Sequence, residues 1–184
     1  MALILNLRGP SGSGKSTLAR RLRNEHESFY AVMANKRKQP LYYDMVTEDD
    51  QRTTLIGHYE SPCGGCDTIA NVDHIYKLVE ERAEYGDVIF EGMIISSEFQ
   101  RTLALNKKHN LQVIQLNTSV DECIRSVNLR RAARGVGPLG SVKNIEGKHK
   151  SVMSTCAKLA GAGVPVFAGN RDQCFEQCKY LLNL

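Results

Sequence analysis

The stretch that most constrains the fold of this chain runs from Gly9 to Thr17 and reads GPSGSGKST. It matches G-x-x-x-x-G-K-S, the pattern of a loop that curls backbone N–H groups around phosphate oxygens. An apolar run at residues 2–7 precedes the loop, and Leu18 and Leu22 follow it at helical spacing. Strand, glycine-rich loop and helix in this order predict a phosphate-binding loop, although a Gly/Ser-rich turn could match the pattern by chance.

The residue types in this loop indicate separate roles. Glycines tolerate backbone angles that a Cβ disfavours, and the helix that opens near Lys15 adds its positive N-terminus. We expect Lys15 to reach the β- and γ-phosphates of ATP and the Ser16 hydroxyl to hold Mg²⁺. The predicted nucleotide-binding residues of the loop are Gly9, Ser11, Gly12, Ser13, Gly14, Lys15, Ser16 and Thr17.

The length of 184 residues suits one domain spanning residues 1–184. No apolar run reaches the roughly eighteen residues that a membrane span needs, and no basic leader precedes the first strand. Six cysteines without a secretory signal favour reduced thiols. We therefore expect a cytoplasmic protein; the sequence leaves its oligomeric state open.

The net charge of +4 is unevenly distributed. Residues 101–151 hold ten Lys and Arg against three Asp and Glu. A basic second half favours a polyanionic ligand, and the alternative is that a nucleotide and its lid need several arginines in any case.

Strand-like and helix-like segments alternate along the chain, which predicts an α/β fold of three layers: a largely parallel sheet with helices on both faces. Pro165 cannot donate to a strand ladder, so we expect the strand at 163–168 near the sheet edge. Right-handed crossovers would bring Gly9, Glu91 and Asn117 to one edge. The other strands are expected at 30–34, 41–45, 53–59, 87–92 and 111–116.

Three helix starts carry a capping signal. Asp67 is placed to cap a helix that begins near Ile69 and ends at Gly86. Ser97 with Gln100, and Ser119 with Glu122, are spaced as capping boxes.

The phosphate loop, the strand that ends at Glu91 and the arginine-rich helix end at Arg130, Arg131 and Arg134 together resemble the nucleoside and nucleotide kinases among the P-loop proteins. The resemblance implies a phosphotransferase that uses ATP and Mg²⁺, with a mobile lid over the transferred phosphoryl group. The sequence contains no Asn-Lys-x-Asp run of the kind that reads guanine, so a GTPase is disfavoured.

The expected lid spans approximately residues 130–145, with Gly135 and Gly137 as pivots. Arg130 and Arg134 are four residues apart on one helix face, so both are candidate catalytic residues, and Arg130 is also expected to bind nucleotide. The alternative is a solvated basic helix end favoured by the helix dipole.

A kinase needs a carboxylate that takes or orients the proton of the acceptor hydroxyl, and Asp44, Glu91 and Asp67 are the candidates. Glu91 also suits Mg²⁺ coordination, directly or through water. Asp67 could serve only as a helix cap.

The segment 57–67 resembles that of small bacteriophage kinases that phosphorylate hydroxymethyluridine within DNA, which implies a DNA acceptor. The turn Lys36-Arg37-Lys38 and the aromatic residues Tyr42, Tyr43 and Tyr59, which could stack a base, fit that interpretation. These lysines could instead be solvated and the tyrosines could fill a sheet core. A kinase of small nucleosides or nucleotides and a non-enzymatic nucleotide-binding protein remain the alternatives.

Cys63 and Cys66 have the spacing of half a zinc site or of a redox pair, but no second pair follows at matching spacing. We expect the two glycines between them to form a tight loop against the substrate. Cys123, Cys156, Cys174 and Cys178 are expected in the core.

Overall fold

The computed structural model describes residues 2–34 and 37–184, so Lys36 of the predicted basic turn lies outside the described residues. The strands are β1 (Leu3–Arg8), β2 (Ser28–Val32), β3 (Tyr42–Val46), β4 (Arg52–Ile56), β5 (Asp87–Glu91), β6 (Asn110–Leu116) and β7 (Val166–Gly169). The α-helices are α1 (Lys15–Asn24), α2 (Val72–Arg82), α3 (Gln100–Lys108), α4 (Val120–Ala132), α5 (Lys143–Gly161) and α6 (Arg171–Leu182). Two short 3₁₀ helices are η1 (Cys66–Thr68) and η2 (Ile95–Ser97).

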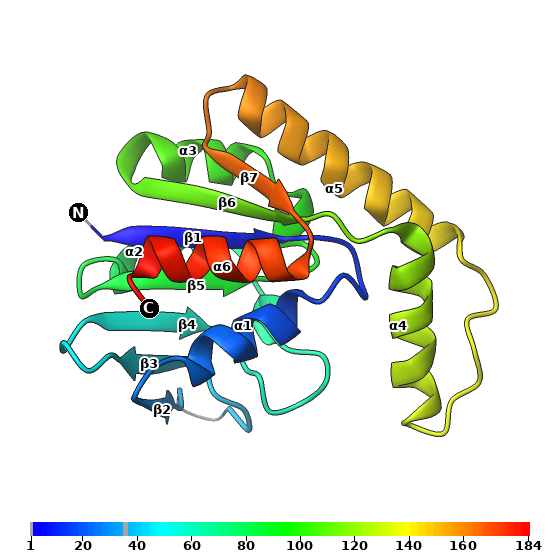
Figure 1. Cartoon of the computed structure of the whole chain (residues 1–184), viewed down its shortest axis with the longest axis horizontal. Helices are drawn as coiled ribbons and strands as arrows, with labels where there is room; N and C mark the ends of the chain where they lie inside the picture. Colours follow the sequence, from blue (N-terminus) through cyan, green and yellow to red (C-terminus); the bar gives the residue numbers. More distant parts are fainter. Residues whose placement is uncertain (1, 35–36) are drawn as a thin grey trace.

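The seven strands form one sheet in the order β2-β3-β4-β5-β1-β6-β7 (Figure 1). β1 pairs in parallel with β5 and β6, β4 pairs in parallel with β5, and β6 with β7. Only β3 runs against its two neighbours among the described strands. The predicted mostly parallel α/β sheet is confirmed.

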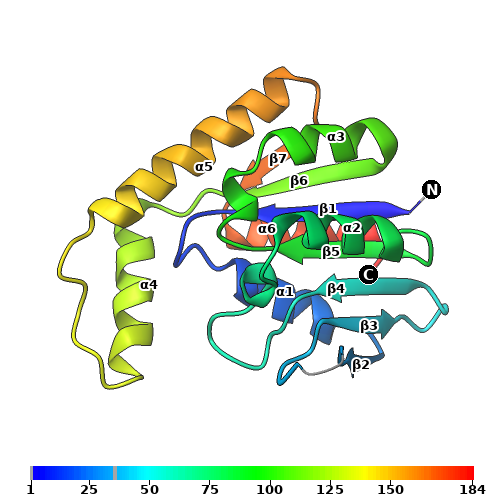
Figure 2. The ribbon, with the colours of Figure 1, turned by 180° about the vertical axis from the view of Figure 1, so that it is seen from behind.

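Successive residues of a strand point to opposite faces of the sheet, and β1 shows how this builds two cores. Ile4 joins a buried cluster with α2, α3 and α5, whereas Leu5 and Leu7 join a second cluster with α1 and α6. Figure 1 shows α1 and α6 in front of the sheet, and Figure 2 shows α2 and α3 over the opposite face. Apolar burial on both faces therefore fixes the central strands and the loops at their ends.

The sheet edges and the buried cysteines agree with the sequence. β7 pairs with β6 at one edge of the described sheet, and the Pro165 carbonyl accepts a hydrogen bond from Val113 N at 2.9 Å. Cys123, Cys156, Cys174 and Cys178 are buried. Within the described ranges, no helix is both long and apolar enough to cross a membrane.

One predicted capping box is confirmed. The Ser119 hydroxyl accepts from Glu122 N, and the Glu122 carboxylate accepts from Ser119 N, at the start of α4. This start lies beside the phosphate loop, because Thr118 Oγ1 donates to Ser13 O at 2.9 Å.

The other two capping predictions are wrong. α2 begins at Val72 and is capped by the Asn71 side chain, because Asp67 lies in η1 and its Oδ1 accepts from Met93 N instead. α3 begins at Gln100 without a side-chain cap, because Ser97 belongs to η2. In both cases a short 3₁₀ turn stands where the pattern predicted the first turn of a helix.

Candidate active site

The phosphate loop connects the carboxyl end of β1 to the N-terminus of α1. Gly12 and Gly14 have φ angles of 85° and 104°, which glycine adopts without strain. A Cβ at Gly12 would lie 2.3 Å from the Cys123 carbonyl oxygen of α4, and one at Gly14 would lie 2.8 Å from Arg171 Nε. The loop is therefore held from outside by α4 and by the start of α6.

Gly9 and Ser13 shape the loop without lining its cavity. A Cβ at Gly9 would lie 2.4 Å from Ser13 Oγ, so the close turn requires glycine there. The buried Ser13 hydroxyl has no hydrogen-bond partner among the described residues, whereas its carbonyl accepts from Thr118.

Lys15 folds back over the loop. Its Nζ donates to the carbonyls of Gly9 at 2.8 Å and Pro10 at 3.3 Å, and Lys15 is only 7% exposed. Burial lowers the pKa of Lys15, while the nearby carboxylates of Glu91 and Asp67 oppose that shift. These carbonyls are weak neutral partners for an ammonium, and a bound phosphate would replace them with charged oxygens.

Glu91 ends β5 directly beside the loop, since it pairs with Leu7 of β1. It is 1% exposed, and its Oε1 accepts a hydrogen bond from Ser16 Oγ at 2.7 Å. Burial raises the pKa of Glu91, against the opposing effects of Lys15 and Ser16. A hydroxyl and a carboxylate that meet beside a phosphate loop are oxygen donors of the kind Mg²⁺ prefers, so these two residues fit a Mg²⁺ site.

The segment from Gly57 to Asp67 lies over this carboxylate. Gly65 has a φ of 88°, and a Cβ there would lie 2.6 Å from Glu91 Oε1. Backbone hydrogen bonds join Gly65 to His58, and Arg20 of α1 donates to Tyr59 O at 3.1 Å. The expected tight glycine turn is therefore present and is tied to the helix of the phosphate loop.

Cys66 is buried in this turn and Cys63 is exposed. Across the part of the chain that the structure describes, no group of three or more His, Cys, Asp or Glu side chains is placed to hold a metal ion. Cys66 packs in the buried cluster with α2, and burial raises the pKa of its thiol well above its ordinary value, which disfavours the thiolate.

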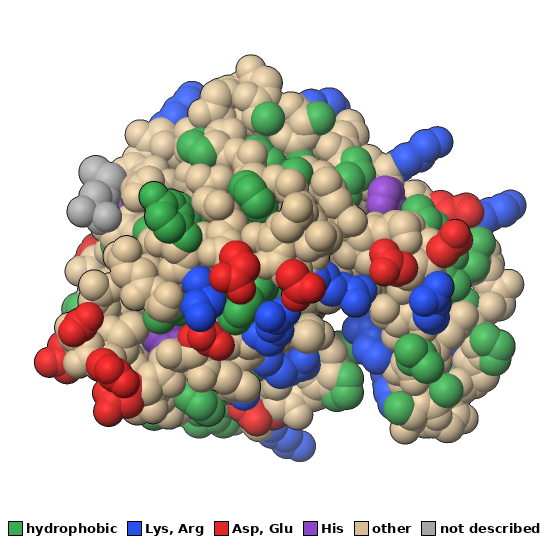
Figure 3. Space-filling view, in the orientation of Figure 1, with side chains coloured by type: hydrophobic (Ala, Val, Ile, Leu, Met, Phe, Trp, Pro, Cys, Tyr) green, Lys and Arg blue, Asp and Glu red, His purple; other side chains and the backbone are tan. Residues whose placement is uncertain are grey.

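A cavity of about 320 Å³ joins these parts. Figure 3 shows the hollow between the main body and the part of the molecule that carries α4, with Lys and Arg side chains on its walls. The lining residues are Ser11, Gly12, Gly14, Lys15, Ser16, Thr17, Pro62, Cys63, Gly64, Asp67, Glu91, Met93, Ser126, Leu129, Arg130 and Arg171. The structure thus brings Lys15, Ser16, Glu91, Asp67 and Arg130 together.

Arg130 crosses the cavity from α4. Its guanidinium donates to Ser11 Oγ at 3.2 Å and contacts Cys63 Sγ at 3.3 Å. One side chain therefore touches both the phosphate loop and the segment that covers Glu91.

Arg134 does not share this position, and the expected common helix face is wrong. α4 ends at Ala132, and Arg134 lies in the following turn, where its N–H bonds to Arg131 O and Gly135 has a φ of 68°. Arg134 is exposed and does not line the cavity. Arg131 instead holds the outer loop through Nε and the Gly137 carbonyl at 2.7 Å.

The carboxylate candidates separate in space. Asp67 lines the cavity and accepts from Met93 N at 2.8 Å. Asp44 does not line it: the side chain forms a 2.8 Å ion pair with Arg82 and accepts from Thr54 Oγ1. Because β3 runs antiparallel to β4, the carboxyl end of β3 lies at the opposite end of the strands from the phosphate loop.

The predicted stacking role of Tyr43 and Tyr59 is wrong, because both rings are buried in the core with α1 and α6. The Tyr43 hydroxyl also donates to Glu60 and accepts from Tyr59 N. Tyr42 is half-buried, and the Arg82 guanidinium lies 4.7 Å from the centroid of its ring. One face of this ring is therefore already covered by Arg82.

Arg171 is a cavity residue that the motifs missed. It opens α6, and its Nε and Nη2 donate to the Ser13 and Gly12 carbonyls at 2.9 and 3.3 Å. Its signal in the sequence is only its position after the last strand.

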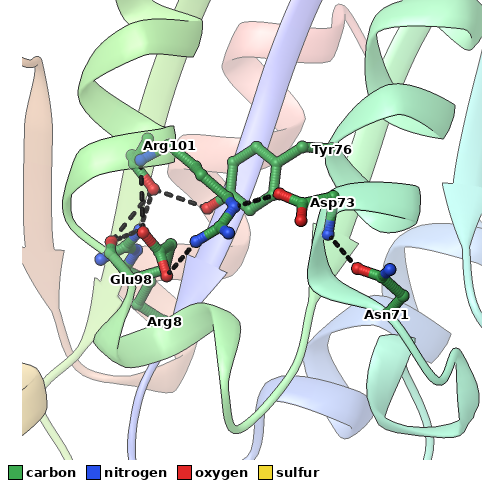
Figure 4. A network of polar contacts seen from close by, with 7 residues as sticks. Arg8, Asn71, Asp73, Tyr76, Glu98 and Arg101 are labelled. Atoms are coloured by element: carbon green, nitrogen blue, oxygen red, sulfur yellow. Dashed lines mark hydrogen bonds and ion pairs between the residues drawn. The ribbon is translucent and has the colours of Figure 1, made fainter.

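Arg8, immediately before the loop, is fully buried and was also missed. Its guanidinium donates to Glu98 O at 2.7 Å and to Thr102, and burial lowers its pKa. Figure 4 shows this cluster, in which Arg101 forms ion pairs with Asp73 at 2.6 Å and with Glu98 at 3.2 Å. Arg8 thereby fixes the start of the phosphate loop against the segment that follows Glu91.

The fold and the site define an α/β protein with a phosphate-binding sequence motif at the carboxyl edge of a mostly parallel sheet, beside a buried carboxylate. No family model matches the chain. It is 46% identical to the "5-hmdU DNA kinase" of Pseudomonas phage PaMx11, across 97% of this chain and 96% of the relative. It is 26% identical to the "5-hmdU DNA kinase" of Delftia phage PhiW-14, across 98% of this chain and 72% of that protein.

The chain therefore belongs to the 5-hmdU DNA kinase family of bacteriophages. The resemblance to bacteriophage kinases of hydroxymethyluridine in DNA, expected from the segment at 57–67, is confirmed.

Proposed function

We propose that this protein transfers the γ-phosphoryl group of ATP to the hydroxymethyl oxygen of 5-hydroxymethyluracil within DNA. The observation that carries the proposal is the cavity in which Lys15, Ser16 and Glu91 meet Asp67 and Arg130. The choice of acceptor rests on the two relatives of this chain that are named 5-hmdU DNA kinases.

At the nucleotide end, the loop N–H groups and Lys15 bind the β- and γ-phosphates. Lys15 leaves the Gly9 and Pro10 carbonyls for the phosphate oxygens. Ser16 and Glu91 would hold Mg²⁺, which would supply positive charge to offset that of the phosphates. Glu91 must be ionised for this role.

At the acceptor end, Asp67 orients the hydroxyl and takes its proton. The acceptor oxygen forms a bond to the γ-phosphorus, the bond from that phosphorus to the β–γ bridging oxygen breaks, and ADP leaves. The Met93 N–H holds the carboxylate of Asp67 in place by a hydrogen bond. Asp67 is exposed, so an acceptor hydroxyl can reach its carboxylate.

Arg130 stabilises the negative charge that spreads over the transferred oxygens. We further propose that residues 130–145 act as a lid, with Gly135 and Gly137 as pivots. Residues 132–138 are exposed, so few apolar contacts would resist movement of this segment.

The test is transfer of label from γ-labelled ATP to DNA that contains 5-hydroxymethyluracil, to unmodified DNA and to the free nucleosides and nucleotides. We expect label in the modified DNA alone and no transfer by Lys15→Ala protein. Label found only in the free nucleosides or nucleotides would contradict the proposal in favour of a small-molecule kinase. ATP binding without transfer to any acceptor would instead identify a non-enzymatic nucleotide-binding protein.

A further inference from the structure

The site is recessed, and that depth limits how a base in DNA reaches it. We infer, resting on the proposed function, that the target nucleotide leaves the double helix and places its base in the cavity against Met93 and Leu129.

The hydroxymethyl group of the substrate is attached to C5 of uracil, and substituents at C5 of a pyrimidine project into the major groove. That groove is about 12 Å wide and about 8.5 Å deep, which admits a helix or a two-stranded ribbon. Lys15 and Glu91 are only 7% and 1% exposed in a cavity that is also lined by α4 and by Pro62, Cys63, Gly64 and Asp67. These walls would meet the DNA backbone before a hydroxyl within the groove reached a phosphate held by Lys15.

The cavity wall has the chemistry that an extruded base needs. Met93 follows the strand of Glu91 and Leu129 projects from α4, so two separate elements supply apolar side chains to a cavity otherwise rich in charge. Leu129 is 66% exposed and Ile94, which follows Met93 in the sequence, is 59% exposed, although both are large apolar residues. Enzymes that act on extruded bases hold them between aromatic or apolar side chains.

The surroundings suit the phosphate backbone that such a base would remain attached to. The part of the chain around α4 and the start of α5 carries exposed cations. They are Arg125, Arg134, Lys143, Lys148 and Lys150.

Extrusion costs a few kcal/mol for a paired base and least for an unpaired one. The test therefore uses one 5-hydroxymethyluracil in three settings: opposite adenine, opposite an abasic site, and in a single strand. Single-turnover transfer at saturating ATP should be about tenfold or more faster opposite the abasic site than opposite adenine. A 2-aminopurine beside the target should brighten when the protein binds the paired duplex.

Leu129→Ala should slow transfer to the paired duplex about tenfold more than transfer to the single strand, because only the paired base must be held out of the stack. The matched control is Tyr180→Ala, an exposed position near the end of α6 that does not line the cavity, and its rates should equal those of the parent protein.

Equal rates for paired and abasic-opposed substrate, with no change in fluorescence, would overturn the inference and leave the proposed kinase activity standing. An equal loss on all three substrates in Leu129→Ala protein would overturn the role of that residue against the base. Transfer to none of the three would overturn the proposed function itself, and this inference with it.

Discussion

Lys15 and Glu91 are two opposite charges that burial shifts in opposite directions. Burial lowers the pKa of Lys15 and raises the pKa of Glu91, and each side chain opposes the shift of the other. Both charged forms are therefore held at a cost that a more polar environment would not impose. Such a buried pair beside a phosphate loop is a functional arrangement rather than a source of stability.

The raised pKa of Glu91 gives a prediction for stability and activity together. A carboxyl group with a raised pKa in the folded state contributes stability below its unfolded pKa, and that contribution is lost as pH rises through the folded value. Glu91→Gln should therefore gain in free energy of unfolding relative to the parent protein as pH rises through this range, while losing about a hundredfold or more in kcat. Denaturant unfolding across pH, together with transfer rates, checks both.

A Glu91→Gln protein that became progressively less stable than the parent with rising pH would contradict the assigned direction of the shift. The parent enzyme should also lose activity on acidification at a higher pH than an ordinary carboxylate would require, because Glu91 must be ionised.

Asp67 and Asp44 form a matched pair of substitutions. Asp67→Asn should lower kcat about a hundredfold or more, since it removes the base but keeps the size of the side chain. Asp44→Asn should leave kcat unchanged and cost about 1–2 kcal/mol of stability, because it weakens the half-buried contact with Arg82. Steady-state kinetics and chemical unfolding measure the two effects. The reverse pattern would assign the base to Asp44.

At the scale of elements, the parts that the sequence predicts well are those in which local and global signals agree. β1, the phosphate loop and α1 are such a case, because apolar burial, glycine angles and helix spacing all favour the same boundaries. The capping box at Ser119 is another, since no other partner competes for its groups.

The mispredicted elements have distant partners that compete with the local pattern. Aspartate is a residue type that commonly caps helices, but the carboxylate of Asp67 accepts a hydrogen bond from Met93 N, which lies in a remote loop. Tyr43 and Tyr59 have aromatic rings that could stack on a base, yet both rings are buried in the core beside the sheet. Arg171 carries no local signal at all, because only the packing of α6 against the phosphate loop makes it a cavity residue.

The segment over Glu91 gives a prediction at this scale. Gly65→Ala would place a Cβ 2.6 Å from Glu91 Oε1 at a φ of 88°, so we expect a loss of about 1–3 kcal/mol in stability and a disproportionate loss of activity. Gly161→Ala, at the end of α5, is the control, since a Cβ at Gly161 would have no neighbouring atom within 4 Å and its φ is not positive. Thermal unfolding and kcat/KM of both variants provide the measurement; indistinguishable variants would contradict the close packing of this turn.

At the scale of the whole molecule, charge is segregated along the chain. Three of the ten basic residues between 101 and 151 lie in α3, and the other seven lie in α4, the loop after it and the start of α5. Of these elements, α4 lines the cavity. Figure 1 shows α4 standing beside the sheet rather than on it. This arrangement leaves one side of the cavity rimmed by a basic surface.

DNA binding should therefore weaken steeply with salt, because each neutralised phosphate releases counterions. Lys148→Gln should lower the slope of log affinity against log salt by about one, uniformly across DNA sequences. Lys77→Gln on α2, outside the basic segment, should leave the slope unchanged. Fluorescence anisotropy over a range of salt concentrations measures the slopes. A binding constant insensitive to salt would rule out this surface as the DNA contact.

The most direct test of the central claim is to identify the atom that receives the phosphate. Duplex DNA with blocked 5′ ends and one 5-hydroxymethyluracil should be incubated with ATP, Mg²⁺ and the protein, then digested to nucleosides and examined by mass spectrometry. The phosphorylated product should carry the phosphate on the hydroxymethyl group of the base. Complete digestion that returns only unmodified 5-hydroxymethyldeoxyuridine, while free nucleosides or unblocked 5′ ends are phosphorylated, would contradict the account.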